Sequence, residues 1–159
     1  MTLALGIDPG TATTGYGLVR LMPDGELVAV DFGIFSTPKD ESPAVRLEML
    51  YNDLTKLLKK YKPETAGVEK LFFSRNVSTA IAVGQARGVI MLAIQKAGME
   101  IFEYTPNEVK QAVAGYGSAD KRQVQEMVRA LLQLEKIPKL DDAADALAIA
   151  ITHLNTKRY

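Results

Sequence analysis

Hydrophobic and polar residues alternate along the first part of the chain in the pattern of β-strands. Residues 3–8 form an apolar run that ends in the turn sequence DPG, and β-branched and aromatic residues are frequent in residues 15–21 and 26–35. The turn-forming sequence PDG separates the second of these segments from the third. Runs of this composition between turn formers predict three strands that follow one another as an antiparallel meander.

After residue 41 the apolar spacing becomes that of helices. Ser42 and Pro43 begin the first helix, leucines recur at helical spacing as far as Tyr61, and Pro63 stops it. The later elements predicted from the pattern are strands at 65–69 and 100–104 and helices at 76–97, 106–114, 120–134 and 141–154. Strands and helices therefore alternate in the middle of the chain, and helices complete it.

This order of elements predicts an α/β fold. Three antiparallel strands that continue into α/β units give a mixed sheet of five strands flanked by helices. Asp8 ends the first predicted strand and Glu69 the fourth. Ligands bind at the carboxyl ends of strands in open α/β sheets, so both carboxylates are expected at that edge if the two strands lie parallel and adjacent.

The composition is that of an ordinary globular protein, with 47% hydrophobic and 24% charged residues. A length of 159 residues allows one well-buried core but not two ordinary domains, so a single domain spanning 1–159 is predicted. The chain has no cysteine, no basic leader and no stretch that approaches ~18 uninterrupted apolar residues. These features predict a cytoplasmic protein without a membrane segment.

The formal net charge is +0, which argues against a protein that simply coats nucleic acid. Net charge hides its distribution, however, because acidic metal ligands would offset basic residues gathered elsewhere. Lysines and arginines do gather, between residues 56 and 62, between 110 and 122, and at 157–158. Groups of this kind are more often solvated surface than phosphate contacts, so charge alone does not predict a nucleic-acid site.

Four acidic residues at the ends of apolar segments far apart in the chain indicate a divalent-metal site. They are Asp8, Glu69, Asp142 and Asp145. Clustered carboxylates repel one another and lose hydration, and a hard cation such as Mg²⁺ offsets that cost. Asp142 and Asp145 share a face at the start of a helix, but Asp141, four residues before Asp145, would share it equally. Spacing does not choose between Asp141 and Asp142 as the ligand. An aspartate at the start of a helix can instead cap it, and we expect this role for Asp141.

Four segments together resemble the RuvC family of bacterial Holliday junction resolvases. They are GIDPGTATTGYG, GVEKLFFSRNVSTAIAVGQARGVI, YTPNEVKQAVAGYGSADKRQVQ and DDAADALAIAITH. The resemblance implies a ribonuclease H-like fold and an acidic tetrad of Asp8, Glu69, Asp142 and Asp145, which would bind two Mg²⁺ ions. It also implies a homodimer that nicks four-way junction DNA at two symmetric positions, with the branch-migration proteins RuvA and RuvB as partners.

The resemblance extends to basic residues expected to contact DNA. Lys121 in SADKRQ has a family counterpart near the scissile phosphate, where an ammonium group would offset charge that develops in the transition state. Lys110 in NEVKQ is a similar but weaker case, and Arg122 is added to the DNA-binding set. For each of these residues the plain alternative is a solvated surface position.

The segment after Glu69 contributes further expected DNA contacts. The family match selects Phe72, next to Phe73, to stack on an unpaired base at the junction. Arg75 and Asn76 are expected to contact phosphate. The alternatives are core packing for both phenylalanines and an N-cap of the long helix for Asn76.

Two other residues have structural interpretations. His153 is the only histidine, and a lone histidine on a mostly apolar helix face is expected in the core or at its rim and not on a metal. Arg87 lies between two glycines of the long predicted helix, where close approach of a neighbouring helix is possible. We expect Arg87 to contact another helix or a second copy of the chain.

Two other classes of protein share parts of this pattern. Nucleotide-binding domains of the actin, heat-shock chaperone and sugar-kinase type have a phosphate loop similar to GIDPGT, but they need a second lobe, which 159 residues do not supply. YqgF-like nucleases act on RNA and share the opening motif, but not the GQARG helix or the DAADALAIA ending. A junction-cleaving nuclease remains the favoured interpretation.

Overall fold

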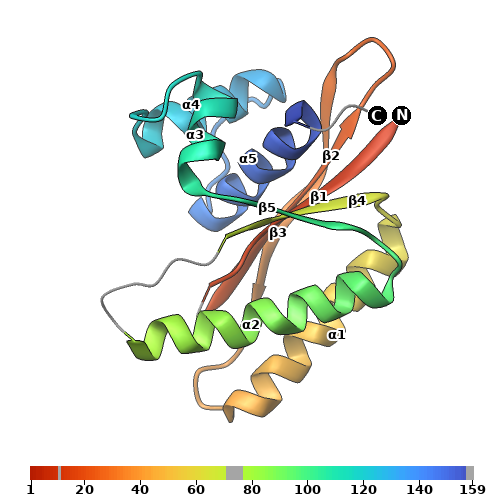
Figure 1. Ribbon diagram of the computed structural model, residues 1–159, viewed down its shortest axis with the longest axis vertical. Helices are drawn as coiled ribbons and strands as arrows, with labels where there is room; N and C mark the ends of the chain where they lie inside the picture. The colour runs from red at the N-terminus through yellow and green to blue at the C-terminus, as the bar shows by residue number, and fades with distance from the viewer. Residues whose placement is uncertain (11, 71–76, 157–159) are drawn as a thin grey trace.

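The computed structural model describes residues 1–10, 12–70 and 77–156, and every predicted strand and helix is present in it (Figure 1). The strands are β1 (Thr2–Asp8), β2 (Thr13–Leu21), β3 (Leu27–Ser36), β4 (Thr65–Glu69) and β5 (Ile101–Tyr104). The helices are α1 (Pro43–Tyr61), α2 (Val77–Lys96), α3 (Pro106–Ala114), α4 (Lys121–Leu131) and α5 (Asp141–Thr156).

The strands form one mixed sheet in the order β3-β2-β1-β4-β5. The pairs β1–β2 and β2–β3 are antiparallel, whereas β1–β4 and β4–β5 are parallel. The predicted meander and the predicted parallel neighbours are therefore both confirmed. The central strand β1 is buried along its whole length, which requires a covering layer on each face of the sheet.

Helices supply both layers. Helices α1 and α2 pack on one face and α3, α4 and α5 on the other (Figure 1). The first layer buries Leu54 and Ile90 against Leu5 of β1, and the second buries Val128 and Leu147. Each face of the sheet thus has its own apolar core, and the two cores meet only through the sheet.

The element bounds differ from the prediction mainly in α4. A helix was predicted at 120–134, but Asp120 is the N-cap of α4: it accepts a hydrogen bond from the Gln123 backbone N–H at 2.8 Å, and Gln123 accepts one from the Asp120 N–H at 2.8 Å. The helix ends early because Gln133 adopts φ 54°, in the left-handed region. The other bounds agree within two residues.

Glycines on β1 and β2 let α5 lie directly on the sheet. Gly6 and Gly17 are paired across the two strands, and Gly15 pairs with Asp8. A Cβ on Gly6 would overlap backbone atoms of α5 at Ala146, and a Cβ on Gly15 would overlap the carbonyl group of Asp142. The backbone of α5 therefore rests on the backbone of the sheet, which a side chain at these strand positions would prevent.

His153 lies at the centre of a buried polar group. It is fully buried and shares hydrogen bonds with Thr65 of β4, at 2.5 Å from Nε2, and with Tyr104 of β5, at 2.7 Å from Nδ1. The expectation that this histidine belongs to the core is confirmed. These contacts tie α5 to β4 and β5.

Helix α2 buries one face and exposes another. Ala86, Ile90 and Ile94 pack into the core, while Ile81 and Leu92 are 57% and 54% exposed. Arg87 forms an ion pair with Glu103 of β5, at the edge of the sheet, and its expected contact with another helix or a second copy of the chain stays a prediction. By length and composition α2 would also be able to cross a membrane, but a single helix of this kind is weak evidence for a membrane span.

Candidate metal centre at the end of the sheet

Asp8 and Glu69 lie side by side at one edge of the sheet, as their positions at strand ends predict. Strand β1 runs parallel to β4, with Ile7 opposite Val68. The residue that follows each of these is acidic, so the two acids lie next to each other. Asp8 is 9% exposed and Glu69 is half-buried. The Asp8 carboxyl is within hydrogen-bonding distance of the Glu69 carboxyl.

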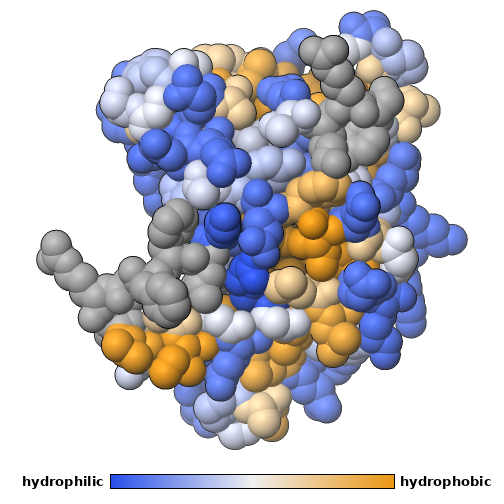
Figure 2. All heavy atoms as spheres, viewed as in Figure 1, coloured by the Kyte–Doolittle hydropathy of each residue, from blue (hydrophilic) through white to orange (hydrophobic). Residues whose placement is uncertain are grey.

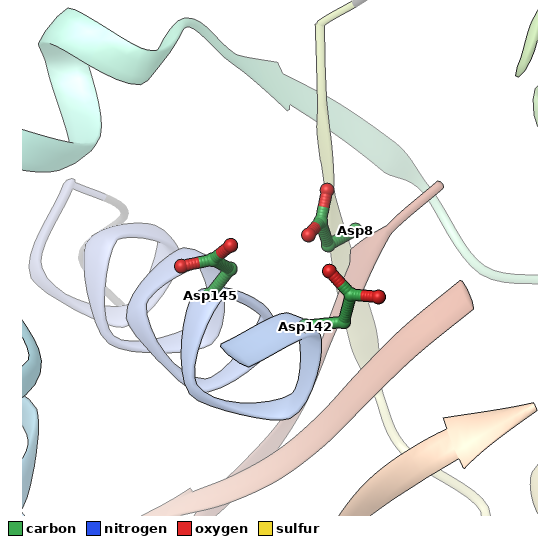
Figure 3. A group of neighbouring side chains, drawn as sticks. All are labelled: Asp8, Asp142 and Asp145. Carbon is green, nitrogen blue, oxygen red and sulfur yellow. The ribbon is translucent and has the colours of Figure 1, made fainter. Parts of the chain in front are cut away.

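Helix α5 brings two more carboxylates to this edge. Asp142 and Asp145 extend from its first turns toward Asp8 (Figure 3). One carboxylate oxygen from each of Asp8, Asp142 and Asp145 lies within 4.8 Å of the others. Elements far apart in the sequence therefore converge on one point, and the close packing of α5 on the glycines of β1 and β2 sets their separation.

Asp141 faces away from this cluster. Its carboxylate forms an ion pair with Lys121 at 3.1 Å and accepts a hydrogen bond from Gln125 at 3.1 Å, and both partners belong to α4. The expected capping role is wrong, because Asp141 is the first residue of α5 and its side chain reaches across to another helix. The pKa of Asp141 is lowered, chiefly by Lys121 and then by Gln125. Asp142 therefore has the ligand geometry that Asp141 lacks.

Burial and neighbouring acidic groups together disfavour the ionised forms of Asp8 and Asp145. Burial, followed by the hydrogen bond and charge of Glu69, raises the pKa of Asp8 from 3.8 to about 10. Burial raises the pKa of Asp145 to about 6 against the opposing effect of Lys121. Ionising these groups together is costly without a cation, and oxygen ligands at this spacing suit a hard divalent ion. The donor set thus fits the metal that the sequence indicates.

Thr13 supports the cluster, although nothing in the sequence analysis identified it. Its hydroxyl donates a hydrogen bond to the carboxylate of Asp142. Thr13 begins β2, in the threonine-rich stretch TATTG that follows the first acidic residue. A hydroxyl near a strand end is a weak signal, because only the tertiary contact with α5 shows which of the threonines is used.

The predicted basic residues divide into two sets. Lys110 of α3 and Lys121 of α4 border a cavity together with Glu69 and Asp145. The pKa of Lys121 is raised, first by its hydrogen bond to Asp141. Arg122 is not beside them: its side chain is 76% exposed and pairs with Glu126 on the outer side of α4 at 3.4 Å.

The remaining predicted DNA contacts lie outside the described residues. Phe72, Arg75 and Asn76 belong to residues 71–76, which connect Glu69 of β4 to α2. Their expected stacking and phosphate contacts therefore stay predictions. The same holds for the alternatives, core packing of the aromatic pair and capping by Asn76.

A mixed sheet of this strand order, with carboxylates at the shared end of β1 and β4 and at the start of a C-terminal helix, defines a nuclease of the ribonuclease H-like class. Nucleases of this class use divalent metal ions. The family model described as "Crossover junction endodeoxyribonuclease RuvC" matches residues 4–153. The chain belongs to the RuvC family.

Individual relatives agree with this assignment. The chain is 55% identical over 152 residues to the crossover junction endodeoxyribonuclease RuvC of Roseiflexus sp. (strain RS-1), covering 96% of this chain and 90% of the relative. It superposes on the Thermus thermophilus RuvC structure with a TM-score of 0.90 at 35% identity, covering 97% of this chain and 94% of that one. For T. thermophilus RuvC in complex with Holliday junction substrate the TM-score is 0.88 at 32% identity, with coverage of 98% and 94%.

The carboxylate cluster predicts an unusual dependence of stability on pH. The folded state raises the pKa of Asp8 and Asp145 above the value of 3.8, so without metal it binds more protons than the unfolded chain above about pH 4. We expect the melting temperature in EDTA to fall by about 2–8 °C between pH 5 and pH 8. With a divalent cation present the fall should be smaller, because the bound ion replaces the protons.

Thermal melts followed by circular dichroism test this expectation. The Asp8→Asn variant is the control, since it lacks the most strongly shifted group and should show a flatter profile in EDTA. The expectation would be contradicted if the melting temperature of the wild type in EDTA stayed level or rose between pH 5 and pH 8, and if Asp8→Asn gave the same profile.

Proposed function

We propose that this chain is a Mg²⁺-dependent endonuclease that resolves Holliday junctions by two symmetric nicks. The convergence of Asp8, Asp142 and Asp145 beside Glu69, in a chain of the RuvC family, carries the proposal. One of its structural relatives is in complex with a Holliday junction substrate, as its description states. The proposed unit of function is residues 1–159 as a single nuclease domain, working in the cytoplasm.

The four carboxylates are proposed to hold two Mg²⁺ ions. Asp8 is the shared ligand, because it is the group on which the charges of Glu69, Asp142 and Asp145 all act. Mg²⁺ held by these residues would lower the pKa of an attacking water and would stabilise the departing oxygen of the phosphodiester. Thr13 orients Asp142 through its hydroxyl, and the close packing of α5 on the sheet keeps all the ligand atoms near one another.

Basic residues are proposed to guide the DNA strand to this site. Lys121 and Lys110 lie beside Glu69 and Asp145, where ammonium groups would offset charge on the reacting phosphate. Arg122 is proposed to contact the DNA backbone farther out on α4. Phe72, Arg75 and Asn76 follow Glu69 directly in the chain, and their proposed contacts are stacking for Phe72 and phosphate for the other two.

A second copy of the chain is proposed to pack on the exposed face of α2. Val77, Ile81 and Leu92 project from one side of this helix at helical spacing and are 69%, 57% and 54% exposed. Gly88 lies among them, with nothing within 4 Å of an added Cβ, so another helix has room to approach closely. Figure 2 shows an apolar patch over the N-terminal end of α2. A homodimer would cover this surface and supply two sites for paired nicks.

Replacing Ile81 by Glu is expected to convert the dimer into a monomer. The carboxylate would lose its hydration in the interface, and we expect dimer dissociation to increase at least ~30-fold. Light scattering coupled to size-exclusion chromatography measures the change. Val45→Glu on α1 is the control, because Val45 is a 40% exposed apolar residue that belongs to a different helix. A wild-type monomer, or a variant that remains dimeric, would contradict this arrangement.

The proposed partners besides DNA are the branch-migration proteins RuvA and RuvB. Family membership supports them, since a resolvase needs a junction that has been recognised and moved. The chain would then act at the end of this process, in DNA recombination and repair.

The decisive experiment offers the purified chain a synthetic four-way junction, a linear duplex and an RNA–DNA hybrid, each with Mg²⁺ and with EDTA. We expect two symmetric nicks in the junction with Mg²⁺ only, and little cutting of the duplex. Cleavage of the RNA hybrid in preference to the junction would overturn the proposal in favour of a YqgF-like activity. Cutting in EDTA would overturn the assignment of the metal.

A further inference from the structure

A groove of about 470 Å³ lies between α1 and α2, and the proposed function makes no use of it. Three lysines border the groove, Lys59 and Lys62 at the C-terminal end of α1 and Lys96 at that of α2, and all three are exposed. Among the described residues that line it there is no acid. Ammonium groups from two different helices therefore gather around one hollow.

This groove lies at the end of the sheet opposite the carboxylate cluster. Asp8 and Glu69 end the parallel strands β1 and β4. Helices α1 and α2 each lead back to the start of the next parallel strand, β4 and β5, so the C-terminal ends of both helices lie at the other end of the sheet. The length of α1, about 28 Å, separates the two ends. The groove is therefore a surface distinct from the proposed nuclease site.

The floor of the groove is apolar. Leu58 of α1 and Ala93 of α2 are 6% and 3% exposed, and the ring of Tyr51 is partly buried beside them. The Nζ atom of Lys96 lies 6.0 Å from the centroid of the Tyr51 ring. An occupant that carries carboxylates next to an apolar side chain would match both the rim and the floor.

The positive charges on the rim are available to a partner. In the part of the chain that the structure describes, no carboxylate forms an ion pair with Lys59, Lys62 or Lys96. A lysine in the last turn of a helix also interacts favourably with the helix dipole, which accounts for each lysine singly. It does not account for lysines of two helices that border the same hollow with an apolar floor. This combination is complementary to an anionic partner.

The shape of the groove favours a peptide over a DNA duplex. Packed helices lie about 8–10 Å apart, and the hollow between them is concave, so the broad convex surface of a duplex would not reach its floor. A peptide segment presents single side chains that are narrow enough to enter a groove between helices. The apolar floor then adds to the affinity, as it would not for a phosphate backbone.

We propose that the groove between α1 and α2 binds an acidic segment of a partner protein, with carboxylates on the three lysines and an apolar side chain against Leu58 and Ala93. The inference goes beyond the proposed function and does not depend on junction cleavage. Because the groove is at the far end of the sheet, a partner bound there leaves the metal centre open to DNA.

Fluorescence anisotropy with a defined probe tests the proposal. The probe is a short labelled peptide in which aspartates flank two phenylalanines, and the wild-type chain is titrated into it at low salt. We expect saturable binding that weakens at least ~tenfold in the double variant Lys59→Glu/Lys96→Glu, which reverses one charge on each helix. Binding should weaken with added salt, and at least ~tenfold for a peptide with asparagine in place of each aspartate.

The matched control is the double variant Lys56→Glu/Lys60→Glu. It changes the net charge by the same amount on α1, but these two lysines line a different hollow, together with Tyr16 and Asp31. We expect it to bind the peptide within about threefold of wild type, because charges outside the groove are screened. Melting temperatures of all the proteins show whether each variant is folded.

Three outcomes would overturn the proposal. The first is no saturable binding of the peptide by the folded wild type at protein concentrations up to about 1 mM. The second is an equal loss in the two double variants, which would mean that only net charge matters. The third is a Lys59→Glu/Lys96→Glu variant that binds the peptide normally but binds junction DNA less tightly, which would assign these lysines to DNA. Failure of the proposed function is distinguishable, because the junction would then stay uncut while the peptide still bound.

Discussion

Replacing Asp8 by Asn is expected to abolish junction cleavage and, at the same time, to stabilise the metal-free protein. Asp8 is the carboxylate on which the other three acids act, so its amide would remove the proposed shared ligand. We expect the cleavage rate to fall at least ~10³-fold, which corresponds to about 4 kcal/mol of barrier. Gel assays of single-turnover cleavage measure the rate, and fluorescence anisotropy should show junction binding close to that of wild type.

The gain in stability follows from the burial of the Asp8 carboxyl and from its acidic neighbours. Asp8 is 9% exposed and its pKa is raised to about 10, so without metal the folded chain must keep this carboxyl protonated near neutral pH, which costs stability because the unfolded chain releases the proton. A neutral amide of the same size removes that cost, and we expect about 1–2 kcal/mol of added stability at pH 8 in EDTA. Loss of activity with a rise in melting temperature separates a metal ligand from a residue that maintains the fold.

Asp141→Asn is the matched control, because Asp141 lies on the same helix as two proposed ligands but turns toward Lys121 and Gln125. Its cleavage rate should stay within about tenfold of wild type, since an exposed ion pair contributes little. Cleavage retained by Asp8→Asn, or lost equally in Asp141→Asn, would mean that the ligands are assigned wrongly.

Replacing Gly15 by Ala is expected to detach α5 from the sheet. The new Cβ would overlap the backbone of Asp142, which cannot move aside as a flexible side chain can. We expect a loss of at least ~3 kcal/mol, a large part of the stability of a domain, and cleavage should disappear because Asp142 and Asp145 move with the helix. Chemical denaturation gives the free energy of unfolding, and the junction assay gives the rate.

Gly33→Ala is the control for this substitution. Gly33 also belongs to the sheet, in β3, but its Cβ would meet only the ring end of Tyr16, at 2.9 Å from the hydroxyl oxygen. The Tyr16 ring stacks on Phe35, but a side chain shifts more readily than a helix backbone, so we expect a smaller loss, of about 1–2 kcal/mol, and nearly normal cleavage. If Gly15→Ala were as stable and active as Gly33→Ala, the backbone contact would not be what positions α5.

Sequence patterns predicted the sheet and most of the carboxylate cluster, because both depend on short segments of the chain. Asp8 and Glu69 end apolar runs, and the rule that ligands gather at the carboxyl ends of parallel strands brings them together. Helical periodicity placed Asp145 on a face with either Asp141 or Asp142 and was unable to choose between them. The choice depends on α4, whose Lys121 and Gln125 contact Asp141, and this contact is not encoded within α5 itself.

Other features depended on contacts between distant segments in the same way. The hydroxyl of Thr13 meets Asp142 only after α5 has packed on the sheet, so none of the threonines of TATTG stood out in the sequence. For Arg87 a contact with another helix or a second copy of the chain was expected, and the intrachain ion pair with Glu103 was not predicted, because the place of β5 at the sheet edge is set by the whole topology. The periodicity of apolar residues predicts which residues share a face of a helix or strand, but tertiary packing determines which residues that face contacts.

The glycine contact between α5 and the sheet also bears on how such an enzyme changes over time. Because backbone rests on backbone, the span between the strand-borne and helix-borne acids does not depend on the volume of core side chains. We therefore expect conservative substitutions within the two apolar cores to change the separation of Asp8 from Asp142 little. The exposed face of α2 and the cavity between α3, α4 and α5 lie outside this contact, so we expect substitutions there to leave the separation of the acids unchanged.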